Sequence, residues 1–168
     1  MKLQAKSYPL KATWGFTMLE ILIGASIIIA SFLGVLTVFD RLTKSSRQMV
    51  ELTQANFLLE EGIEAARTWR DSGWANLGNW PTETEYYLTW SGGKWATSTI
   101  NFYLDGKFER RVKVLNVNRD NTSQDIILNG GTDDPNTKLV TVTVAWSASG
   151  EAATTTKIMS AYLTNLFN

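Results

Sequence analysis

Hydrophobic side chains fill residues 16 to 39 almost without interruption. This run contains no proline and one charged residue, Glu20. At roughly 1.5 Å of rise per helical residue, a helix over this run is about 36 Å long, enough to cross the hydrocarbon core of a bilayer. The pattern therefore predicts a membrane-spanning helix over residues 16–40.

After Asp40 the apolar residues recur every three or four positions, which is typical of a helix with one buried face. They are Leu52, Ala55, Leu59, Ile63 and Ala66, and their polar neighbours are Glu51, Gln54, Glu60, Glu61, Glu64 and Arg67. No proline interrupts residues 10 to 80, and Arg70 followed by Gly73 is a typical helix end. We predict one helix over residues 16–71, about 80 Å long, whose second half (41–71) lies against a globular head.

The pattern becomes that of β-strands in the last half of the chain. Residues 72–84 contain glycine and proline and predict a loop. Predicted strands cover residues 85–90 and 94–100, which form a hairpin, and then 108–117, 138–146 and 154–163, with a turn at 134–138. In the fourth strand Val140, Val142 and Val144 face one side, and Thr141 and Thr143 face the other. The expected fold is α+β, with an antiparallel sheet in a head of residues 72–168 covering the apolar stripe of the helix.

Charge and composition argue against several kinds of function, including nucleic-acid binding and histidine-based catalysis. The sixteen basic residues equal the sixteen acidic ones, and Lys2, Lys6 and Lys11 all precede Gly15 while every acidic residue follows it. Nucleic-acid-binding proteins normally have a clustered basic patch, and a chain with balanced charges does not suggest one. No nucleic-acid partner is therefore expected. The chain has no cysteine and no histidine, which excludes disulfides and removes the commonest general base and metal ligand.

The segment before the apolar run is short, basic and broken by Pro9, and we interpret it as a leader outside the folded unit. A conventional secretory signal has a shorter apolar core, of about 7–15 residues. Hydropathy alone leaves a plain single-pass anchor open. Glu20 is the informative residue, because an ionised group in lipid costs at least a few kcal/mol and is usually retained for a function or a partner.

The order Gly15, Phe16, Thr17, Met18, Leu19, Glu20, after a basic segment and before an apolar helix, resembles the processing signal of type IV pilins and pseudopilins. The resemblance implies that a prepilin peptidase removes residues 1–15 by cleaving after Gly15 and methylates the new amine of Phe16. It also implies that Glu20 assists assembly by pairing with the amino terminus of a neighbouring subunit.

The same resemblance implies the partners and the location. The partners are other pilin subunits, the membrane, the prepilin peptidase and the pilus assembly machinery. The precursor is expected in the cytoplasmic membrane with the head outside, and the mature chain in a filament. Trp14 and Thr37 depart from the family pattern, which often has a basic residue and a helix-kinking proline there.

Inside the apolar run Ser26, Ala30 and Gly34 recur every four residues. Such a stripe of small residues lets another helix approach closely. Small residues are also common in membrane helices generally, so the pattern has two interpretations.

Two clusters in the head suggest ligands. Asp120, Asn121, Asp125, Asp133 and Asp134 provide oxygens that suit Ca²⁺, although such residues are also ordinary turn formers and the spacing is not that of an EF-hand. Trp74, Trp80, Trp90 and Trp95 fall within 22 residues. Exposed, these rings would stack on sugars or contact a partner; we favour the interpretation that they fill a small core.

The sequence therefore predicts a structural filament subunit that is not an enzyme and needs no cofactor. Glu61 and Glu64 are expected to be solvated helix residues rather than a catalytic pair. The main alternative is a minor or tip pilin whose tryptophan-rich head binds a ligand, and a membrane-anchored enzyme is the second.

Overall fold

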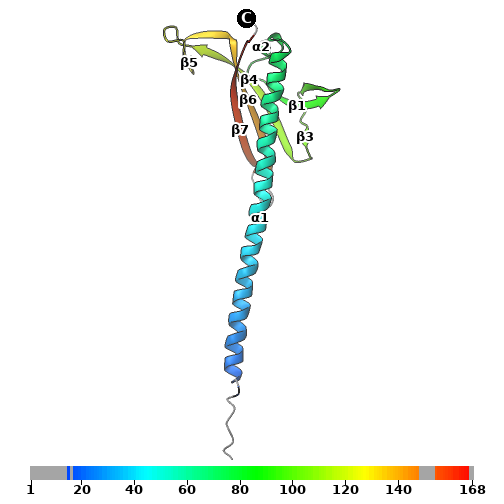
Figure 1. Cartoon of the computed structure of the whole chain (residues 1–168), viewed down its shortest axis with the longest axis vertical. Coiled ribbons are helices and arrows are strands. Elements are labelled where there is room, and N and C mark those ends of the chain that lie inside the picture. The colour runs from blue at the N-terminus through cyan, green and yellow to red at the C-terminus, as the bar shows by residue number, and fades with distance from the viewer. Residues whose placement is uncertain (1–14, 16, 148–153, 167–168) are drawn as a thin grey trace, which may run out of the picture. The chain divides into compact units, whose positions relative to one another are not determined.

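The computed structural model describes residues 15, 17–147 and 154–166. The chain divides into two compact units, residues 1–43 and 44–168. Helix α1 (Met18–Asp71) contributes to both, and all the strands belong to the second unit (Figure 1). The predicted α+β class, with a long helix on an antiparallel sheet, is confirmed.

In the first unit, α1 begins where the hydroxyl of Thr17 accepts the backbone N–H of Glu20 at 3.3 Å, as in a helix N-cap. The helix continues unbroken through Thr37, whose hydroxyl donates to the carbonyl of Leu33 at 2.9 Å. A threonine keeps the backbone N–H that a proline lacks, so α1 needs no kink at this position. The predicted helix end at residue 71 is confirmed.

The second unit contains residues 44–71 of α1, the short helix α2 (Ala75–Gly78) and one antiparallel sheet. Its strands are β1 (Glu85–Ser91), β2 (Lys94–Ser98), β3 (Tyr103–Leu104), β4 (Phe108–Arg119), β5 (Ile126–Ile127), β6 (Thr132–Ser147) and β7 (Thr154–Thr164). The order is β2-β1-β4-β6-β7, and β3 and β5 both pair with β4. Within this unit α1 runs along one face of the sheet (Figure 1).

The core lies between that face of the sheet and α1. It contains the valines at 112 and 114 of β4 and at 140, 142 and 144 of β6, together with Ala55, Leu59, Ile63 and Ala66 of α1. Both the predicted helix stripe and the predicted inward valines are confirmed, although Leu52 is only half-buried. Gly62 also belongs to the buried face, because a Cβ there would lie 2.6 Å from Cγ1 of Val142.

Charged residues cross the same interface. Glu51, which the pattern placed among the polar neighbours, is only 6 % exposed and binds Lys107 of the β3–β4 turn. Arg110 of β4 is 2 % exposed, binds Glu61, and holds its guanidinium carbon 5.2 Å from the centre of the Trp95 ring. Glu51 is thus a polar residue of the helix pattern that is buried, because the cation of the β3–β4 turn binds its carboxylate.

Two local predictions differ from the structure. The predicted turn at 134–138 belongs to β6, which pairs with β4 as far as Thr132 opposite Arg119. The register shifts within this segment, because the single β4 residue between Asn116 and Asn118 lies opposite residues 134–137 of β6, and the side chain of Asp134 accepts the N–H of Asn136 at 2.9 Å. The predicted loop at 72–84 contains α2, one helical turn that buries Leu77.

Candidate functional site

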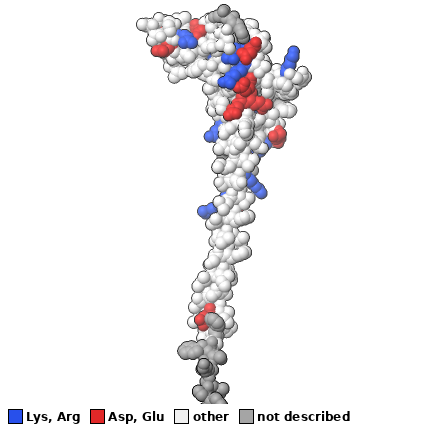
Figure 2. All heavy atoms as spheres, in the orientation of Figure 1, with Lys and Arg blue, Asp and Glu red and all other residues white. Residues whose placement is uncertain are grey.

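The first candidate site is the apolar part of α1. This stretch has no buried residue, and its length and composition suffice to cross a membrane. Large apolar side chains there are between 48 % and 87 % exposed. On the face that Figure 2 presents, this stretch carries almost no charge, whereas red and blue side chains gather over the second unit.

Glu20 lies in the first turn of this helix with its side chain exposed. Among the described residues, none of the ion pairs involves Glu20. Gly15 is exposed, and Phe16 lies outside the described residues, so the predicted cleavage and methylation site is described only in part.

Ser26, Ala30 and Gly34 lie on one face of α1, as a four-residue spacing requires, and all three are exposed. The hydroxyl of Ser26 donates to the carbonyl of Ile23 at 2.7 Å, so its polarity is satisfied within its own helix. A Cβ at Gly34 would meet nothing within 4 Å. This face therefore offers a smooth surface that another helix can approach.

The second candidate site is a hollow of about 420 Å³ in the second unit. We call it the aromatic hollow; it is lined by Trp69, Ala75, Asn76, Asn79, Trp80, Pro81, Tyr86, Trp95, Ala96 and Thr97. The centres of the Trp69 and Trp80 rings are 4.7 Å apart, and those of Trp80 and Tyr86 are 5.5 Å apart, both in edge-to-face geometry. Aromatic rings from the end of α1, from the segment after α2 and from β1 are thus in contact along the hollow.

The tryptophans that we expected to be buried divide into two groups. Trp74, Trp80 and Trp95 are half-buried and pack against the core, whereas Trp90 is 62 % exposed with its ring 5.0 Å from that of Trp95. The prediction of burial is therefore wrong for Trp90 and incomplete for the others.

Trp69 and Tyr86 were not predicted to belong to this cluster of rings. Trp69 follows Ala66 by three residues, so a longer reading of the helix stripe predicts its position. Tyr86 carries no comparable sequence signal, because its place depends on the pairing of β1 with β4.

Two of the aspartates considered for calcium, Asp120 and Asp134, accept hydrogen bonds from other groups of the protein. The carboxylate of Asp120 accepts the N–H groups of Thr122 and Ser123 at 2.8 Å each, and these bonds lower the pKa of Asp120. Burial raises the pKa of Asp134, but hydrogen bonds from Arg119, Thr137 and the N–H of Asn136 outweigh it and leave that pKa lowered. Within the described ranges, no three acidic residues come together to hold a metal ion.

Glu61 and Glu64 also have structural partners. Glu61 binds Arg110 across the helix–sheet interface, and Glu64 binds Arg67 one turn along α1. Their carboxylates are thus bound to two different arginines rather than directed at a shared substrate position.

Comparisons with protein-family models, with curated proteins and with solved structures found no match to this chain.

Proposed function

We propose that the chain is a subunit of a type IV pilus or of a related pseudopilus. The precursor is anchored in the cytoplasmic membrane by the apolar part of α1, cleaved after Gly15, and polymerised through the same helix. The observation that carries this proposal is an apolar helical stretch with no buried residue and with a single carboxylate, Glu20, in its first turn.

The apolar surface of α1 is suited to lipid in the precursor and to neighbouring helices in the filament. A helix that is hydrophobic on all sides must be surrounded by lipid or by other helices. Lipid serves the precursor, and neighbouring copies of the helix serve the filament. The face formed by Ser26, Ala30 and Gly34 allows close packing of the kind that membrane helices use for association.

Glu20 distinguishes this proposal from a plain anchor. A carboxylate in an apolar layer is retained when a cation neutralises it. Cleavage after Gly15 creates one such cation, the amine of Phe16, on every subunit. A neighbouring subunit that presents this amine to Glu20 would neutralise both charges and fix the axial position of the two helices.

Mass spectrometry of the native protein tests the processing step. We expect a mature chain that begins with N-methylated Phe16, and an unprocessed precursor for Gly15→Val. Gly24→Ala is the matched control, because a Cβ at Gly24 meets nothing within 4 Å and the position is remote from the cleaved bond. An intact leader on the native protein would contradict the proposal.

A minor or tip subunit is the second candidate, and the aromatic hollow favours it. A subunit that only builds a filament needs no hollow lined by half-exposed rings. Quantitative mass spectrometry of purified filaments separates the two candidates. A major subunit dominates the filament mass, whereas a tip subunit is present at a few copies per filament.

A further inference from the structure

The aromatic hollow combines aromatic rings, amides and a hydroxyl without any charge. Of its ten lining residues, four are aromatic, three are Asn76, Asn79 and Thr97, and none is acidic or basic. We propose that this hollow binds a neutral carbohydrate. The proposal concerns the second unit alone and holds whether or not the chain forms filaments.

The rings suit one face of a sugar. The C–H groups on one face of a pyranose carry a slight positive charge and are attracted to the negative face of an aromatic ring. Trp69, Trp80 and Tyr86 contact each other edge to face, so their rings differ in direction and hold each other in place. Such fixed rings lower the entropy cost of binding, because fewer side chains must become ordered.

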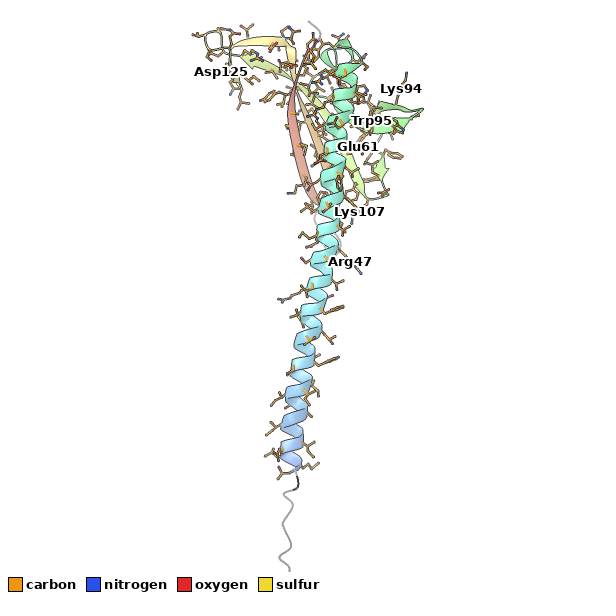
Figure 3. All side chains as sticks on the ribbon, viewed as in Figure 1. Arg47, Glu61, Lys94, Trp95, Lys107 and Asp125 are labelled. Carbon is orange, nitrogen blue, oxygen red and sulfur yellow. The ribbon has the colours of Figure 1, made fainter. Side chains whose placement is uncertain are left out.

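The ring of Trp95 is held by a cation. The guanidinium of Arg110, itself bound to Glu61, lies over the Trp95 ring at 5.2 Å. Figure 3 shows Trp95 on the β1–β2 hairpin beside α1, close to the label of Glu61. The cation occupies the position of a stacking partner within the protein, and the remaining exposed surface of Trp95 borders the hollow.

The polar side chains of the hollow can form hydrogen bonds with the hydroxyls of a sugar. A side-chain amide offers two donors and one acceptor oxygen, and a threonine hydroxyl acts in either direction. Asn79 and Thr97 are exposed at the hollow, and Asn76 donates to the hydroxyl of Ser72 at 3.2 Å, which leaves its oxygen available to accept. Sugar hydroxyls need both donors and acceptors, and the uncharged lining disfavours phosphate, carboxylate and amine ligands, which need a charged partner.

The volume supports a small ligand. At about 420 Å³ the hollow falls in the lower part of the range of roughly 300–1,000 Å³ for small-molecule sites. A mono- or disaccharide unit fits this range. Proline-rich peptides also bind aromatic residues, but they do so along extended grooves, and they use few of the polar contacts that the two asparagines provide.

Saturation-transfer NMR on the full chain tests the proposal. The protein is held in micelles of lauryldimethylamine oxide, because a detergent with a sugar head group would compete. The probes are cellobiose, maltose, lactose and N,N′-diacetylchitobiose, with 3′-sialyllactose as the charged counterpart of lactose and a proline-rich decapeptide as the competing class. We expect at least one neutral disaccharide to bind with a millimolar dissociation constant, and sialyllactose to bind no better than lactose.

Two variants locate the binding. Ala96→Lys places a long cation into the hollow from an exposed strand position and is expected to weaken binding at least about tenfold. Thr99→Lys adds the same charge three residues later, at an exposed position that does not line the hollow, and should bind as the wild type does. Asn79→Ala, at an exposed site, should weaken binding about two- to tenfold through the loss of one hydrogen bond.

Three outcomes would overturn the proposal: no binding of any of the four disaccharides, equal binding by Ala96→Lys, or binding of the decapeptide in place of sugar. Circular dichroism of each variant verifies its fold. Filament assembly is not part of this experiment, so a chain that polymerises and binds no sugar refutes the hollow's role while leaving the filament proposal intact.

Discussion

Val142 occupies the space that a side chain on Gly62 would need. A Cβ at Gly62 would lie 2.6 Å from Cγ1 and 3.0 Å from Cγ2 of Val142, which is fully buried in the middle of β6. Valine has a stiff χ1 angle and no free end that could move aside. The glycine therefore sets how closely α1 approaches the sheet.

The first prediction follows from this contact. Gly62→Ala should lower the free energy of unfolding by about 1 kcal/mol, because overpacking costs about 1–3 kcal/mol and the gain in helix propensity returns about 1. In a Val142→Ala background the same change should become stabilising, because the clash is gone and the propensity gain remains. Urea denaturation followed by tryptophan fluorescence measures both values. An equal effect in the two backgrounds would contradict this contact.

The second prediction concerns the cation between α1 and the sheet. Arg110 is buried, binds Glu61 and donates to the carbonyl of Leu58 at 3.4 Å. Glu61→Gln should destabilise the second unit by about 1–2 kcal/mol, since a charged hydrogen bond is lost while the side chain of Glu61 is half-exposed.

Arg110→Ala should cost more than Glu61→Gln, because it also removes the contact with the Trp95 ring and leaves a void. Glu60→Gln, on the exposed face of α1, is the matched control and should leave the unfolding midpoint unchanged. Equal losses for Glu60→Gln and Glu61→Gln would contradict the role of the ion pair.

The third prediction is a pH dependence at the β4–β6 end. The pKa of Asp134 is lowered in the folded chain, although burial alone raises it, because Arg119, Thr137 and Asn136 hydrogen-bond to the carboxylate. A lowered folded pKa contributes stability that is complete above the unfolded value of about 3.9 and is lost as the pH falls toward the folded pKa.

Asp134→Asn should therefore be less stable than the wild type near pH 6, and the difference should shrink as the pH falls below about 4. Arg119→Gln should behave in the same way, since it removes the partner of the same ion pair, whose N–O distance is 2.6 Å. Denaturation curves at a series of pH values test this. A difference that stays constant down to acid pH would exclude Asp134 as the titrating group.

The fourth prediction concerns Glu20. Glu20→Ala should leave membrane insertion intact, because the apolar run remains, and should reduce incorporation into filaments at least about tenfold, because the apolar layer then holds an unpaired terminal amine. Immunoblots of sheared filaments and of membranes from the native cell give the two quantities. Normal incorporation would remove the assembly role from Glu20.

The sequence predicted the elements that depend on local periodicity. The inward valines of β6 and the buried stripe of α1 follow from repeats of 2 and about 3.6 residues. The end of α1 at Asp71 follows from Arg70 and Gly73, and the β1–β2 hairpin from the glycines between its strands. The two-residue strands β3 and β5 were missed, because they exist only through pairing with β4. Pro135 concealed the start of β6, since proline usually marks a turn or an edge.

The candidate sites were less predictable for the same reason. Glu20 and the small-residue face are local features of one helix, so their positions could be predicted. The aromatic hollow joins residues from Trp69 to Thr97, and Arg110 reaches Trp95 from another strand. From sequence alone, a charged residue is expected to be exposed to solvent. Glu51 and Arg110 are buried because α1 packs on the sheet, which the sequence pattern does not show.

Three contacts between α1 and the sheet together exclude a sliding motion of the helix. A shift by one turn, about 5.4 Å, would place Leu58 or Ala66 against Val142 in place of Gly62. It would also move Glu61 away from the buried Arg110 and Glu51 away from the half-buried Lys107, so both ion pairs would break. Residues 44–71 therefore have a single axial setting on the sheet, and the second unit responds to a pull along its helix by holding or by unfolding, without a ratchet between alternative positions.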